Sequence, residues 1–280
     1  MKFIIFILLA ALAFSALVGD SASAATSLPA NPRYVALGDS VAAGAGLPTT
    51  GLSTDVLCGR SSSAYPYQVA ATLNTSVTSV ACSGAKVNKG LYGSQVRRGS
   101  VLPAQIDQAF STGKPDLITM TIGANDARWI EFMTKCYITT CGTRFDNAAA
   151  RVLRADLRIE LSVALYRIKQ YSNASENTTP PKVLVGGYYT PLSTAECVGS
   201  NRITPTEVSW IKSQTNSLNQ ALRSVMPYFS YAQYVPVSFS GHELCSDDSW
   251  VQGIDSLAPL HPTAEGQTAI AQSFVNAVYR

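Results

Sequence analysis

The sequence predicts an α/β protein in which helices cover both faces of a parallel β-sheet. Short apolar runs rich in β-branched residues alternate along the chain with segments whose apolar residues recur at helical spacing. These runs are too apolar for either of their faces to meet water, which is typical of parallel strands buried on both sides. In sheets of this kind, functional sites collect beyond the carboxyl ends of the strands.

The expected strands and helices follow one another in regular order. The first strand, 33–37, ends at Gly38, and the most clearly defined strand, 116–122, ends at Gly123. A long amphipathic helix follows, with its apolar face between 153 and 168. The other expected strands are 77–81, 182–185 and 231–237; the other expected helices are 64–73, 104–110, 205–226 and 263–279; and the expected long loops are 44–63, 127–147 and 190–204.

The beginning of the chain is typical of an exported protein. Met1 to Ala24 carries one early positive charge, an apolar stretch and a small-residue cleavage site, which predicts a secretory signal peptide. A polar leader, 25–32, then precedes a single expected domain, 33–280. With 46% hydrophobic and 14% charged residues, this domain can bury a core of its own. No later segment is apolar for long enough to span a bilayer, and we expect a monomer.

Six cysteines in a chain sent to an oxidising compartment indicate three disulfides, although their spacing leaves 15 pairings open. No cysteine pair has the spacing of a zinc site, so we expect no metal. A formal charge of +3 without a basic run makes nucleic acid an improbable partner. The cysteines are Cys58, Cys82, Cys136, Cys141, Cys197 and Cys245.

Three short motifs at strand ends carry the parts that nucleophilic chemistry needs. A serine hydroxyl needs a base to remove its proton, and the oxyanion that forms after its attack needs aimed hydrogen-bond donors. Ser40 follows the first strand in a Gly-Asp-Ser triplet, where glycines allow a close turn. Gly84, after the second strand, can offer its backbone N–H. Asn125, after the third, can offer its side-chain amide.

The base expected near neutral pH is a histidine, and the chain has only two. His261 lies in Leu-His-Pro-Thr just before the last helix, where a turn can hold an imidazole over the sheet end. His242 has no strand end to place it. We therefore expect His261 to be the base for Ser40.

In these four blocks the chain resembles the SGNH hydrolases, also called GDSL esterases and lipases, and above all their secreted, three-disulfide branch. Ser40, Gly84, Asn125 and His261 match the family's four block residues in order. The resemblance implies a three-layer, flavodoxin-like α/β/α sandwich with a five-stranded parallel sheet. It also implies the disulfide pairs Cys58 with Cys82, Cys136 with Cys141 and Cys197 with Cys245.

The same resemblance implies a mechanism for carboxylic ester hydrolysis. Ser40 would form an acyl-enzyme with His261 as general base, and the oxyanion hole would consist of the backbone N–H groups of Ser40 and Gly84 and the Asn125 side chain. No metal or organic cofactor is implied. The family's fourth block usually has an aspartate where this chain has Ala258. We expect the backbone carbonyl of Ala258 to orient His261, with Asp255 as the alternative.

The substrate is less sharply defined by the sequence than the reaction. We expect a lipid-like ester or a small acyl ester, with phospholipids and acetylated carbohydrates as alternatives. Four aromatic residues near the expected site are candidates to line an acyl pocket: Trp129, Tyr137, Tyr188 and Tyr189. A binding module without activity on the same fold is a further alternative. An α/β-hydrolase is excluded because Ala42 occupies the last position of its Gly-x-Ser-x-Gly turn.

Overall fold

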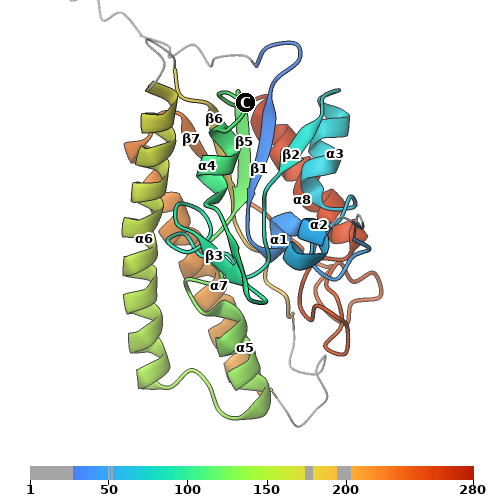
Figure 1. Ribbon diagram of the computed structural model, residues 1–280. Helices are drawn as coiled ribbons and strands as arrows, with labels where there is room; N and C mark the ends of the chain where they lie inside the picture. Colours follow the sequence, from blue (N-terminus) through green and yellow to red (C-terminus); the bar gives the residue numbers. More distant parts are fainter. Residues whose placement is uncertain (1–27, 50, 52, 174–178, 194–202) are drawn as a thin grey trace, which may run out of the picture.

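A computed structural model of the protein describes residues 28–49, 51, 53–173, 179–193 and 203–280. The expected signal peptide, the first three residues of the leader and Cys197 lie outside these residues. Figure 1 shows the strands running side by side, with helices on both sides of them.

The centre of the protein is a five-stranded parallel sheet with the order β2-β1-β5-β6-β7. Counted along the chain, this is the 2-1-3-4-5 order of flavodoxin-like folds. Both β1 and β5 are buried along their whole length, as the apolar runs predict. The strands are β1 (Tyr34–Gly38), β2 (Val77–Ser79), β5 (Leu117–Thr121), β6 (Lys182–Gly186) and β7 (Ala232–Val235).

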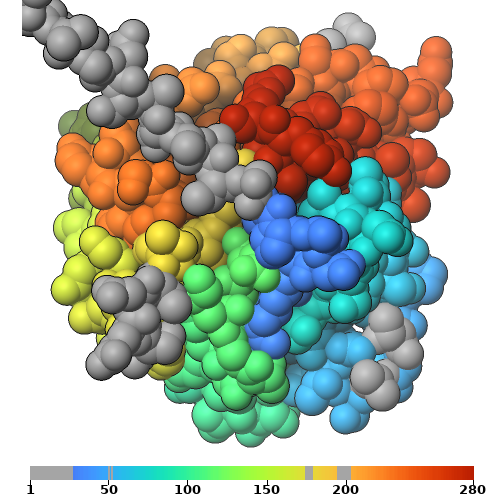
Figure 2. Space-filling view, turned by 90° about the horizontal axis from the view of Figure 1, so that it is seen from above, coloured from blue at the N-terminus to red at the C-terminus, as the bar shows by residue number. Residues whose placement is uncertain are grey.

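Helices on the two faces of the sheet complete the three-layer sandwich. On one face, α3 (Tyr65–Thr72) packs against α8 (Ala264–Val278). Figure 2 looks onto the amino-terminal edge of the sheet and shows the red segment of α8 beside the cyan segment of α3. On the other face, α6 (Arg144–Asn173) contacts α4 (Gln105–Phe110) and α7 (Pro205–Val225), which continues into the short 3-10 helix η2 (Met226–Tyr228).

Two segments expected as loops contain helices instead. The segment 44–63 includes α2 (Ser53–Cys58), and the segment 127–147 includes α5 (Trp129–Ile138) and the start of α6. A small hairpin of β3 (Gln95–Arg97) and β4 (Ser100–Leu102) was also not expected. These pieces are short or lack a regular apolar period, so they depend on tertiary packing. The fold class and the main helices are as predicted, and the strand order is the one that the flavodoxin-like resemblance implies.

Two of the three expected disulfides are present in the described residues. Cys58 bonds to Cys82 and joins α2 to the segment after β2, and Cys136 bonds to Cys141 at the end of α5. Cys245 is also disulfide-bonded, and its expected partner Cys197 lies outside the described residues. Among the helices that the structure describes, none is both long and apolar enough to cross a membrane.

Candidate active site

Ser40 lies in the tight connection between the strand β1 and the short helix α1 (Ser40–Ala43). Gly38 ends the strand with φ +130°, and a Cβ there would come within 2.3 Å of the backbone oxygen of Thr121. Only glycine fits this position without a shift of the backbone. Asp39 caps α1 by accepting the N–H of Val41 at 3.0 Å. The turn thus holds Ser40 at the carboxyl edge of the sheet, where the sequence predicts it.

Asp39 supports this turn from inside the protein. Its carboxyl group is fully buried and accepts hydrogen bonds from the hydroxyls of Thr121, at 3.2 Å, and of Tyr188. Burial raises the pKa of Asp39 to about 6, against the opposing effect of these hydrogen bonds. The hydrogen bonds of Asp39 therefore stabilise the strand ends around Ser40, although burial disfavours the ionised form of its carboxyl group.

His261 contacts Ser40 directly. Its Nε2 lies 2.7 Å from the Ser40 Oγ, and its Nδ1 lies 3.0 Å from the backbone oxygen of Pro259. A carbonyl oxygen can only accept, so Nδ1 carries a proton and donates it to Pro259, which leaves Nε2 of the neutral ring to accept from the serine hydroxyl. Burial lowers the pKa of His261, while the carbonyls of Pro259 and Ala258 oppose that effect. The ring is therefore held in the form that can take a proton.

The residue that orients His261 differs from the one expected. The hydrogen bond from Nδ1 goes to Pro259, while the carbonyl of Ala258 accepts the backbone N–H of His261 at 3.2 Å and acts on the ring only as a second, charge-stabilising group. The turn at Leu260, with φ +65°, brings the Pro259 carbonyl round to the ring. Asp255, the alternative, is exposed. A main-chain carbonyl takes the position of the acid, but one residue later than predicted.

The expected oxyanion donors lie in neighbouring loops that are bonded to each other. Gly84 has φ +79° in the turn after β2, next to the disulfide-bonded Cys82. Asn125 donates one amide hydrogen to the backbone oxygen of Ala85 at 2.9 Å, which leaves its second amide hydrogen for another acceptor. Within the described part of the chain, no backbone carbonyl accepts the N–H of Ser40 or of Gly84. Three donors of the predicted kind are therefore present at this edge.

Comparison with known proteins identifies the family of this chain. The model of the GDSL-like Lipase/Acylhydrolase family matches residues 36–269, a range that includes Ser40 and His261. The chain belongs to this family. Lipase 1 of Streptomyces coelicolor is 31% identical over 261 residues, covering 91% of this chain and 89% of that protein. The lipase of Streptomyces rimosus is 31% identical over 259 residues, covering 90% and 89%.

Two solved structures of Streptomyces enzymes have a similar fold. The extracellular lipase of Streptomyces rimosus has a TM-score of 0.62 at 26% identity, with 88% of this chain and 99% of that chain covered. The phospholipase A1 of Streptomyces albidoflavus has a TM-score of 0.61 at 26% identity, with the same coverage of 88% and 99%. As a member of the GDSL family with these relatives, the protein is a carboxylic ester hydrolase.

Three glutamines, which sequence reasoning missed, hold the Ser40 turn and its neighbouring loops in place. Gln105 bonds both the N–H and the oxygen of Gly38, at 2.7 and 2.9 Å. Gln267, from α8, donates to the oxygen of Val41 at 3.0 Å. Gln252 donates to the oxygens of Ala45, at 2.9 Å, and Pro262, at 2.8 Å. Gln252 thereby joins the loop after Ser40 to the residue that follows His261.

An apolar cavity of about 180 Å³ opens beside the histidine turn. Its wall includes Leu260, next to His261, and Pro259, whose carbonyl holds the imidazole. Helix α5 supplies much of the opposite wall, so the helix not foreseen in the sequence shapes the space nearest to the base. The remaining lining residues are Met133, Thr134, Tyr137, Leu192, Ile203 and Ile254.

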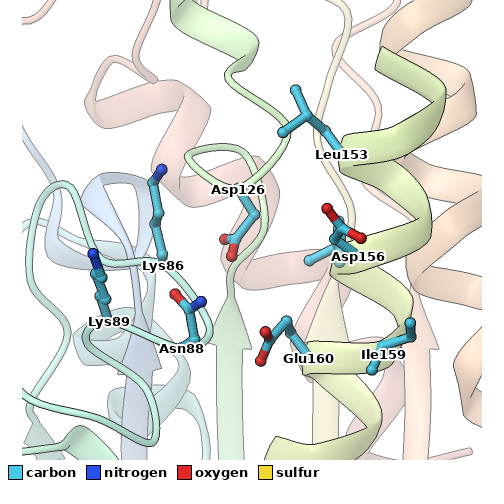
Figure 3. Close-up of a pocket in the computed structure, with 9 residues that line it drawn as sticks. Lys86, Asn88, Lys89, Asp126, Leu153, Asp156, Ile159 and Glu160 are labelled. Carbon is cyan, nitrogen blue, oxygen red and sulfur yellow. The ribbon is translucent and has the colours of Figure 1, made fainter. Parts of the chain in front are cut away.

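A second, polar cavity of about 350 Å³ lies behind the oxyanion loops, between Lys86, Lys89 and the helix α6. Figure 3 shows Asp126 at its centre, between the lysine loop and the carboxylates of α6. Both carboxylate oxygens of Asp126 accept the N–H of Val87, at 3.0 and 3.2 Å. Burial raises the pKa of Asp126 to about 6. Asp126 therefore adds a second link between the loop after Gly84 and the Asn125 loop, beside the bond from Asn125 to Ala85.

Of the four aromatic residues expected near an acyl pocket, Tyr137 lines the apolar cavity. The other three are buried supports: Trp129 donates to the Thr215 hydroxyl at 3.0 Å, Tyr188 bonds Asp39, and Tyr189 donates to the Leu260 oxygen at 2.7 Å. His242 stacks on Trp250 instead of facing Ser40. Across the described residues, His, Cys, Asp and Glu side chains form no group of three or more that could hold a metal ion.

Proposed function

We propose that Ser40 and His261 carry out the ester hydrolysis of this family as a catalytic dyad. The observation that supports it best is the 2.7 Å contact between Nε2 and Oγ, in a ring whose other nitrogen is committed to a carbonyl. His261 takes the proton of Ser40 while Oγ attacks the ester carbonyl carbon. The negative oxygen that forms is met by the N–H groups of Ser40 and Gly84 and by the free amide hydrogen of Asn125.

The imidazolium then returns its proton to the departing alcohol, and the acyl group remains on Ser40. Water attacks this acyl-enzyme with His261 again as base, which releases the carboxylic acid and restores the serine hydroxyl. The carbonyls of Pro259 and Ala258 stabilise the positive ring during both steps, since they oppose the effect of burial on the pKa of His261. A carboxylate is not needed at this position.

We propose an ester with an apolar acyl chain as the substrate. The cavity beside Leu260 is lined mainly by aliphatic and aromatic side chains and begins one residue from the base, so an acyl chain held there would bring its carbonyl to Ser40. This favours a lipid ester over an acetylated carbohydrate, because an acetyl group leaves the cavity empty. The disulfides agree with export, and we propose that Met1 to Ala24 is removed as a signal peptide.

Hydrolysis of p-nitrophenyl esters from acetyl to palmitoyl tests both parts of the proposal. Ser40→Ala should lower kcat by at least about 10³-fold on every ester, because the remaining oxyanion hole and binding supply only the residual catalysis. Equal rates for wild type and Ser40→Ala would instead support a binding module without activity.

Ile254→Trp, which fills the apolar cavity, should lower the rate on long-chain esters at least about tenfold and leave acetyl ester hydrolysis within about twofold. Ile130→Trp, on the exposed side of α5, is the matched control and should change neither rate. If Ile254→Trp slows all esters equally, the cavity does not hold the acyl chain.

A further inference from the structure

The outer face of α6 carries an apolar stripe that no other part of the described chain covers. Four large apolar side chains on it are spaced seven residues apart, which is two helical turns, so they lie in one row. They are exposed to 70%, 60%, 65% and 53% of their surface, and Val163, exposed to 37%, lies beside them. The row consists of Phe145, Val152, Ile159 and Tyr166.

The two flanks of this stripe carry side chains of opposite charge. Arg144, Arg151 and Arg158, all exposed, repeat at the same seven-residue interval along one flank. The other flank carries Asp156 and Glu160, and in Figure 3 the Ile159 side chain projects from the side of α6 opposite to Glu160. The helix therefore presents an apolar row with arginines on one side, which is the arrangement of helices that lie in a lipid interface.

The arginines lack acidic partners within the described protein. None of the three forms an ion pair among the residues that the structure describes. The pKa of the neighbouring Arg154 is lowered, first by burial and then by the charges of Arg158 and Arg151, so like charges are crowded here. Arg144 lies over the ring of Phe145, 4.8 Å from its centroid, but within the described residues none of the three arginines has an acidic partner. A row of such cations beside an apolar row fits a partner that offers anionic groups next to hydrocarbon.

We propose that the outer face of α6 is a docking surface for anionic lipid. The inference rests on the proposed function only in that a lipid hydrolase must reach an aggregated substrate. The stripe begins at Phe145, near the α5–α6 connection, which Figure 1 shows at the bottom of the molecule, below α1, the helix that begins with Ser40. A second copy of the chain fits the surface less well in an antiparallel pairing, because two α6 helices then set arginine row against arginine row.

The experiment measures sedimentation of the Ser40→Ala protein with vesicles, so that lipid is not hydrolysed. Binding to phosphatidylglycerol vesicles should exceed binding to phosphatidylcholine vesicles at least about tenfold at low salt. Arg151→Gln with Arg158→Gln should reduce binding to phosphatidylglycerol about tenfold or more and remove this preference. Val152→Ser with Ile159→Ser should reduce binding to both vesicles by a similar factor.

Matched pairs elsewhere on the surface serve as controls. Val96→Ser with Val101→Ser removes two side chains that are each exposed to 69%, and Arg98→Gln with Arg280→Gln removes two exposed arginines. Both pairs should bind vesicles within about twofold of the parent. Unchanged binding by the α6 variants, or equal binding of the parent to both lipids, would overturn the proposal.

Two further measurements distinguish lipid binding by α6 from dimer formation and from the proposed ester hydrolysis. Sedimentation equilibrium without lipid should show a monomer; a dimer that Val152→Ser with Ile159→Ser dissociates would mean that a second copy occupies the stripe and that the lipid proposal is wrong. In protein that keeps Ser40, the α6 substitutions should leave hydrolysis of a soluble p-nitrophenyl ester within about twofold. If the protein without substitutions does not hydrolyse the soluble ester, the proposed function is wrong. Vesicle binding does not depend on that hydrolysis and should be unchanged.

Discussion

The two residues of the candidate dyad are held in opposite ways. Ser40 follows a fully buried strand and is surrounded by fixed partners: Gly38 fits only as glycine, and Asp39 is buried and hydrogen-bonded. His261 lies in a turn outside any strand or helix, near exposed Leu257, and depends on main-chain carbonyls and on Gln252. Ser40, the proposed nucleophile, is thus built into the core, whereas His261, the proposed base, is brought to it by a surface loop. Each prediction below tests one side of this difference.

Loss of the imidazole should have the largest effect. His261→Gln keeps a polar side chain but removes the base, so kcat on a p-nitrophenyl ester should fall by about 10³- to 10⁴-fold. Combined with Ser40→Ala, it should cause little further loss, because the two residues act as a unit. A double variant far slower than either single variant would show that they act independently.

The buried acid on the serine side should appear in the pH dependence of stability. The pKa of Asp39 is raised from 3.8 to about 6, so the native state holds this proton more tightly than the unfolded chain does. The contribution to the free energy of unfolding is therefore full below about pH 4 and is lost as the pH rises to about 6, amounting to about 3 kcal/mol for such a shift.

Asp126, whose pKa is also raised to about 6, adds a loss of the same sign. Urea unfolding of Asp39→Asn between pH 4 and 8 should show a shallower decline than wild type, and Asp126→Asn is the matched comparison. A pH dependence unchanged by Asp39→Asn would mean that this carboxyl group is not a buried acid.

On the histidine side, Gln252→Ala should have a moderate effect. Removing its amide frees the histidine turn from the loop after Ser40, and kcat should fall about tenfold with little change in KM, since the base is misplaced while the acyl cavity remains. Gln108→Ala removes a similar side-chain bond that is exposed to solvent, from α4 to the backbone oxygen of Pro103 at 2.9 Å, and should leave kcat unchanged. A change in KM alone would place Gln252 in substrate binding.

The smallest effect is expected from Asp255→Asn. Because the ring donates to a carbonyl and burial lowers the pKa of His261, the acidic limb of kcat/KM should lie below the ordinary histidine pKa of about 6.5. The substitution should change the rate less than about twofold and leave that limb in place. A loss of several hundredfold, with a shifted limb, would make Asp255 the third member of a triad.

Much of the site was open to prediction because it depends on chain order. Ser40, Gly84 and Asn125 each follow a strand, and in a parallel sheet all carboxyl ends meet at one edge, so recognising the strands was enough to bring the three together. The placement of His261 followed in the same way from the helix that begins after it. The helix α5 and the hairpin β3–β4 could not be found so, because neither has a long apolar period.

The sequence by itself determined the parallel sheet and the residues at its carboxyl edge, because hydrophobic period and strand-end chemistry are local properties of the chain; the flavodoxin-like arrangement came from the family resemblance. Only the tertiary structure decided which groups hold the residues of the site in position. Gln105 reaches Gly38 across 67 residues and Gln267 reaches Val41 across 226. The choice of Pro259 over Ala258 depends on one backbone turn at Leu260. Such bonds need distances and angles that no spacing in the sequence contains, since hydrogen bonds weaken steeply away from ideal geometry.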